Sequence, residues 1–148
     1  MRIFFGLLFM AFPMLTSADV EVKAWARATT PGSSSAAIYG VFKNTGAEVM
    51  SFSKINFAGA RQAMIHETRE EQGVLRMTRG SVILSPGESY ELKPGGTHLM
   101  LMGISSPLIE GCRYSFQVVW DNGESSAYHF LTGGYGQMRF PKNGNQCP

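Results

Sequence analysis

Two histidines and two methionines, His66, Met77, His98 and Met100, have the types and spacing that could bind a metal ion. Imidazole and thioether form a soft donor set, which suits Cu(I) better than Zn(II), Mg(II) or Ca(II). A blue-copper electron-transfer site would add a cysteine thiolate, and residues 66–102 contain no cysteine. The residue types therefore predict a Cu(I) site for carriage and transfer of the ion.

Strand geometry would bring these residues together as two local pairs. His98 and Met100 are two residues apart, so on a strand both side chains emerge on the same face. His66 and Met77 lie on the two arms of an expected hairpin. With Glu71–Gln72 as its central turn, the two side chains face each other directly, with Cβ atoms about 5 Å apart. A slip of one residue in this register would turn them to opposite faces.

Each candidate ligand also has a structural interpretation. A methionine in an apolar strand commonly fills the core, and a single histidine is commonly a hydrogen-bonded surface residue. Met64 shares a face with His66, and Met102 shares one with Met100, so each could be either a packing neighbour or a ligand. His129 has no partner at ligand spacing.

An enzyme is not expected. No serine lies in a GxSxG setting and no Cys/His pair is indicated. Glu67, Glu70 and Glu71 lie beside His66, where acid–base chemistry is conceivable, but a solvated hairpin tip is the better interpretation.

Short strands are the elements expected to position the site. Alternating apolar residues and frequent turn signals predict an all-β fold, an antiparallel Greek-key sandwich or barrel. The expected strands span residues 20–25, 36–43, 49–57, 63–67, 74–77, 81–84, 89–92, 98–102, 114–120 and 126–131.

Residues 1–18 are expected to be a cleaved signal peptide, with Arg2 before an apolar run and small residues at the cut. A transmembrane anchor is the alternative, but the run is shorter than the ~20 residues that span a bilayer.

We expect one domain over residues 19–134 and an extended tail over residues 135–148. In an exported protein Cys112 and Cys147 could form a disulfide or remain free. The net charge of +2 does not favour binding to nucleic acid or a membrane surface.

The sequence resembles the periplasmic copper chaperones of the PCuAC family. The resemblance is carried by residues 24–29, His66-Glu67, residues 73–77 and, above all, residues 91–103 (ELKPGGTHLMLMG). The family pattern is a histidine, ten residues, a methionine, about twenty-one residues, then His-x-Met. Here ten residues separate His66 from Met77, and twenty separate Met77 from His98.

This resemblance implies a cupredoxin-like fold in which His66, Met77, His98 and Met100 bind Cu(I). It also implies delivery of copper to a respiratory (cytochrome c) oxidase copper centre or its assembly factors. Thr68 stands where many members carry a methionine, which removes a possible auxiliary ligand. The tail has Met138 but no histidine, which argues against a second, Cu(II) site of the kind that some members carry. The alternative function is an exported β-sandwich binding or adhesion module without a metal role.

Overall fold

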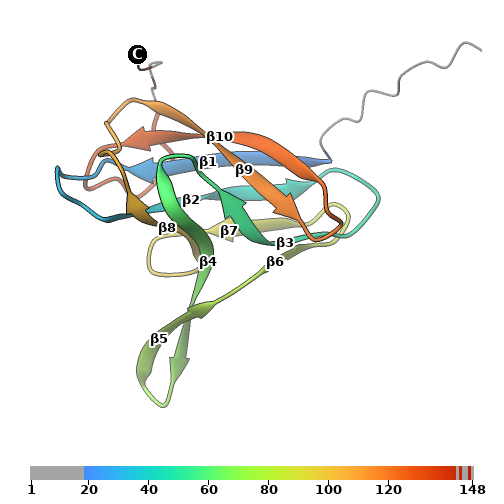
Figure 1. Cartoon of the computed structure of the whole chain (residues 1–148). Coiled ribbons are helices and arrows are strands. Elements are labelled where there is room, and N and C mark those ends of the chain that lie inside the picture. Colours follow the sequence, from blue (N-terminus) through green and yellow to red (C-terminus); the bar gives the residue numbers. More distant parts are fainter. Residues whose placement is uncertain (1–18, 143, 145–146, 148) are drawn as a thin grey trace, which may run out of the picture.

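The computed structural model describes residues 19–142, 144 and 147, and this part of the chain is built from ten β-strands (Figure 1). The expected signal peptide, residues 1–18, lies outside the described residues. Within the described residues, no helix has the length and apolarity needed to cross a membrane. The strands are β1 (Val20–Arg27), β2 (Ser35–Asn44), β3 (Met50–Asn56), β4 (Ala60–Glu71), β5 (Val74–Arg79), β6 (Val82–Leu84), β7 (Ser89–Leu92), β8 (His98–Ile104), β9 (Arg113–Trp120) and β10 (Ser125–Gly133).

Nine of the strands form a sheet that closes on itself, in the order β5-β4-β8-β2-β1-β10-β9-β3-β6, and β7 pairs with β2 beside this path. Closure comes from one additional pairing between β3 and β4, at Lys54 and Met64. Strands β1 and β10 run parallel, and the other pairings are antiparallel. The prediction of an all-β barrel or sandwich is therefore confirmed.

The core fixes which side chains of β4 and β8 face outward. Ile65, Leu99 and Leu101 are fully buried in the apolar cluster. Successive residues of a strand point to opposite faces, so His98 and Met100 face away from that cluster. The burial of three aliphatic side chains therefore sets the orientation of the candidate ligands.

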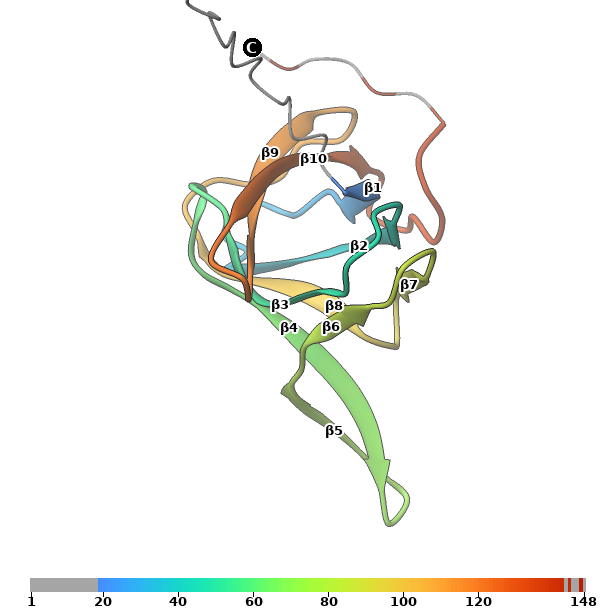
Figure 2. The ribbon, with the colours of Figure 1, turned by 90° about the vertical axis from the view of Figure 1, so that its right-hand side faces the viewer.

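Strand β4 continues beyond the barrel and pairs with β5 in a projecting hairpin (Figures 1 and 2). Its tip is the two-residue turn Gln72-Gly73, and both residues have positive φ, 53° and 78°. Positive φ at both central residues defines a type I′ turn, whose twist matches that of paired strands. The hairpin therefore extends the sheet away from the core.

Several contacts attach the segment after β10 to the barrel. Cys112 and Cys147 form a disulfide, with Cα atoms 5.1 Å apart. The Arg27 guanidinium donates a hydrogen bond of 2.7 Å from Nε to the carbonyl oxygen of Gln137. Of the two alternatives for the cysteines, a disulfide or free thiols, the structure shows the disulfide.

Candidate metal centre

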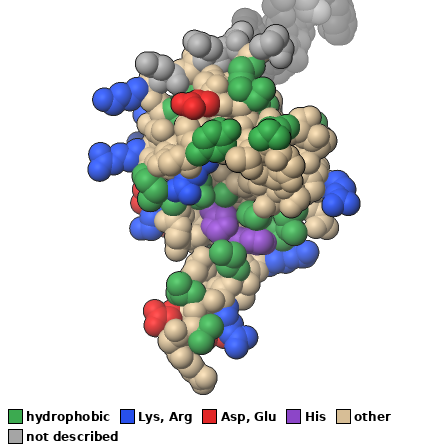
Figure 3. All heavy atoms as spheres, turned by 90° about the vertical axis from the view of Figure 1, so that its left-hand side faces the viewer, with side chains coloured by type: hydrophobic (Ala, Val, Ile, Leu, Met, Phe, Trp, Pro, Cys, Tyr) green, Lys and Arg blue, Asp and Glu red, His purple; other side chains and the backbone are tan. Residues whose placement is uncertain are grey.

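Strands β4 and β8 place His66 and His98 directly opposite each other. Their ring centroids are 5.9 Å apart, with the ring planes inclined at 74°. A ring nitrogen lies about 2 Å from a bound metal, so two imidazoles sharing one ion have centroids at most roughly 6 Å apart. Figure 3 shows histidine side chains together at the surface, where the hairpin leaves the barrel. The separation of the two rings therefore fits a shared ion.

The environment of His98 fixes the nitrogen that can bind a metal. Its side chain is 8% exposed, and its Nδ1 lies 2.8 Å from the carbonyl oxygen of Gly96. A carbonyl oxygen only accepts hydrogen bonds, so Nδ1 carries the proton and donates. The lone pair is then on Nε2, and the hydrogen bond to Gly96 orients the ring as it does in many metal-binding histidines.

His66 has a buried nitrogen that lacks a partner. Among the described residues, no hydrogen-bond partner is found for its Nδ1. Burial lowers the pKa of the His66 imidazole, and the charges of His98 and Arg79 lower it further. The neutral imidazole is the form that binds metals. An unsatisfied buried nitrogen beside a second ring nitrogen with a free lone pair fits the donor set expected for a metal ion.

Met100 extends this arrangement along β8. It lies two residues from His98 on the same face and directly opposite Met64 of β4. Met64 and Met100 are both half-buried. This face of the sheet therefore carries two adjacent cross-strand pairs, one of histidines and one of methionines.

The predicted pairing of His66 with Met77 is wrong in register. The turn is at Gln72-Gly73, so Met77 lies opposite Thr68 and His66 lies opposite Arg79. The observed register of β4 and β5 differs from the expected one by two residues, so every side chain stays on its expected face. Met77 is therefore on the same face as His66 but diagonal to it, and its side chain is 67% exposed.

Aromatic side chains continue the row of the two histidines across the sheet. The rings of Tyr39 and His98 have centroids 6.2 Å apart, and those of Trp25 and Tyr39 are 4.8 Å apart. The Arg27 guanidinium lies 5.7 Å from the centroid of the Tyr39 ring. Sequence reasoning missed Trp25 and Tyr39, because only the pairing of β1, β2 and β8 brings them beside His98.

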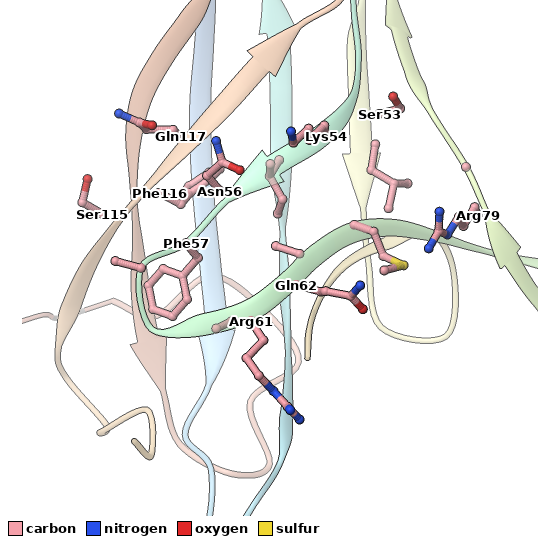
Figure 4. Close-up of a pocket in the computed structure, with 17 residues that line it drawn as sticks. Ser53, Lys54, Asn56, Phe57, Arg61, Gln62, Arg79, Ser115, Phe116 and Gln117 are labelled. Atoms are coloured by element: carbon pink, nitrogen blue, oxygen red, sulfur yellow. The ribbon is translucent and has the colours of Figure 1, made fainter. Parts of the chain in front are cut away.

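Two hollows border the methionine pair. A groove of about 820 Å³ runs between β3, β4 and β9 and is lined in part by Met64, Arg79 and Phe116 (Figure 4). A second hollow of about 670 Å³ is lined in part by Met100 and Met102. Met64 and Met100 thus each adjoin solvent-accessible space.

Other donor groups do not gather into a competing site. No group of three or more histidine, cysteine, aspartate or glutamate side chains suited to a metal occurs among the described residues. His129 is exposed on β10. The arrangement of hard or thiolate donors typical of zinc and calcium sites is therefore not found in the described part of the chain.

The sequence of residues 21–130 matches the family described as "LpqE-like: Putative lipoprotein LpqE-like". The chain belongs to this family. A curated relative is "Putative lipoprotein Lxx21020" of Leifsonia xyli subsp. xyli (strain CTCB07), which is 32% identical over 106 residues. That match covers 70% of this chain and 63% of the relative, so the chain spans less than two thirds of the relative's length.

Solved structures of PCuAC domains share the fold. The apo PCuAC domain of PmoF1 superposes with a TM-score of 0.66 at 20% identity, covering 78% of this chain and 94% of that domain. The copper-bound PCuAC domain of PmoF2 gives a TM-score of 0.64 at 18% identity, covering 78% and 93%. Apo-DR1885 of Deinococcus radiodurans gives 0.64 at 18% identity, covering 94% and 97%. The predicted resemblance to the PCuAC family and its cupredoxin-like fold are confirmed.

Proposed function

We propose that this chain is an exported copper chaperone, not an enzyme, that binds one Cu(I) through His66, Met77, His98 and Met100. The observation that carries the proposal is the opposed His66–His98 pair, with Met100 on the same face. Two imidazoles and two thioethers are neutral soft donors, which suit a monovalent soft ion. The copper bound to the PCuAC domain of PmoF2 supports copper as the cargo.

The exposure of the ligands suits transfer of the ion by ligand exchange. His98 is largely buried, whereas Met77 is 67% exposed on the projecting hairpin. An incoming ligand from a partner would displace Met77 first, while His98 and Met100 still hold the ion. We propose a respiratory (cytochrome c) oxidase copper centre, or one of its assembly factors, as the acceptor.

Export, with a periplasmic location, is part of the same proposal. The Cys112–Cys147 disulfide supports it, because disulfides persist mainly in oxidising compartments. A donor set without thiolate is also compatible with an oxidising compartment, where free thiols would be oxidised.

Copper binding is tested by titrating the purified protein with Cu(I) against a competing chelator. We expect one equivalent to bind, and the melting temperature to rise because the ion binds only the folded state. The double variant His98→Ala/Met100→Leu should lose both effects. A wild-type protein that binds no Cu(I) and melts at the same temperature with and without it would instead support a binding module without a metal role.

A further inference from the structure

Met64 occupies a position equivalent to that of a ligand. It lies directly opposite Met100 and two residues from His66 on the same face. Opposed residues on an antiparallel ladder have Cβ atoms about 5 Å apart, and alternate residues of one strand are separated by roughly 6.6 Å. We infer that Met64 is a further thioether ligand of the copper ion. This inference rests on the proposed function and adds a residue to the proposed ligand set.

The surroundings of Met64 differ from those of a methionine buried in the core. Its neighbour Ile65 is fully buried in the apolar cluster, whereas Met64 is half-buried on the opposite face. Met64 is not among the side chains that form or cover that cluster. Packing of the core therefore does not account for this side chain.

Backbone pairing holds Met64 more firmly than Met77. Met64 is paired on one side with Met100 of β8 and on the other with Lys54 of β3. Met77 belongs to the projecting hairpin and lies diagonal to His66, where Cβ atoms are about 7–8 Å apart. Ordering an exposed methionine costs side-chain entropy. Met64 is therefore the better placed of the two to hold copper at rest, and Met77 the better placed to release it.

Open space adjoins the Met64 side chain. Met64 lines the 820 Å³ groove between β3, β4 and β9, whose described lining residues include no carboxylate. An unbranched methionine has three rotatable bonds and adapts to such gaps. The Met64 side chain therefore borders open space in which it can change rotamer; the cationic side chains of Lys54, Arg61 and Arg79 line the same groove.

Methyl NMR of the purified protein, labelled with ¹³C at the methionine methyl groups, tests this assignment directly. One equivalent of Ag(I), a soft monovalent ion, should shift the methyl resonances of both Met64 and Met100. In a chelator competition, Met64→Leu should weaken Cu(I) binding by about tenfold or more, in the range found when the environment of a metal is altered. The matched control is Met102→Leu, on the same face one pair further along and 39% exposed. Its Cu(I) affinity should change by less than about twofold.

Two results would overturn the inference, and they differ in what they imply for the proposed function. If Met100→Leu weakens Cu(I) binding while Met64→Leu does not and the Met64 methyl resonance stays in place, Met64 is a neighbour of an otherwise correct site. If the wild-type protein binds no Cu(I), the proposed function fails together with the inference. Equal melting temperatures of the metal-free variants would show that a loss of affinity is not a loss of folding.

Discussion

His66 and His98 are directly opposed on β4 and β8, although 31 residues of chain separate them, and their ring centroids lie 5.9 Å apart. Both rings face away from the core, because Ile65 and Leu99 beside them are fully buried. The two histidines are thus paired by the ladder that packs the barrel. The register that packs the barrel therefore also positions the candidate metal ligands.

The tautomer of His98 is open to a direct test. The contact between its Nδ1 and the Gly96 carbonyl oxygen at 2.8 Å requires a proton on Nδ1. We expect ¹⁵N NMR of the metal-free protein at neutral pH to show a protonated Nδ1 and an unprotonated Nε2. Adding one equivalent of Ag(I) should move the Nε2 resonance and leave Nδ1 protonated. A proton on Nε2 alone would contradict the assignment.

Leu99 and His98 should have opposite roles, because they point to opposite faces of β8. Leu99→Ala should lower the free energy of unfolding by about 2–5 kcal/mol through loss of buried aliphatic contacts, with a smaller effect on Cu(I) affinity. His98→Ala should lower Cu(I) affinity strongly and cost about 1 kcal/mol of stability, the value of one hydrogen bond. Urea unfolding without metal and chelator competition measure the two effects. Unchanged affinity in His98→Ala would contradict the ligand role.

Arg79 should oppose the binding of a cation, because it lies directly across the ladder from His66. Arg79→Gln should tighten Cu(I) binding by up to about fivefold, since exposed charge interactions contribute roughly 0.2–1 kcal/mol. The gain should shrink as salt is added, because salt screens exposed charges. Arg76→Gln is the matched control. Arg76 lies on the other face of β5, with its Nε 3.6 Å from Oε2 of Glu71. Equal affinities of the two variants would argue against an electrostatic effect at His66.

The Cys112–Cys147 disulfide should contribute substantially to stability. The two cysteines are 35 residues apart in the sequence. Closing a loop of that size typically stabilises a protein by about 2–4 kcal/mol. Cys147→Ser should therefore lower the free energy of unfolding by that amount in a urea titration. Adding a reductant should bring the wild-type protein to the stability of the variant and leave the variant unchanged. A variant as stable as the oxidised wild type would show that the bond is energetically neutral.

The sequence by itself determined the local features of this protein. Turn residues and alternating apolar residues placed the strands, and the two-residue spacing of His98 and Met100 put both on one face, because a strand has a period of two. The chemistry of imidazole and thioether also depends on residue type alone. The expected pairing of His66 with Met77 failed because the position of the turn depends on which residues adopt positive φ, and these are Gln72 and Gly73.

Only the tertiary structure decided which distant residues meet. The pairing of β4 with β8 places His66 opposite His98 and Met64 opposite Met100. The pairing of β8 with β2 packs Tyr39 against His98. Such pairings join strands remote in sequence, and their register is set by how Ile65, Leu99 and Leu101 pack in a shared core. No local pattern carries that information, because it depends on the fit of many side chains at once.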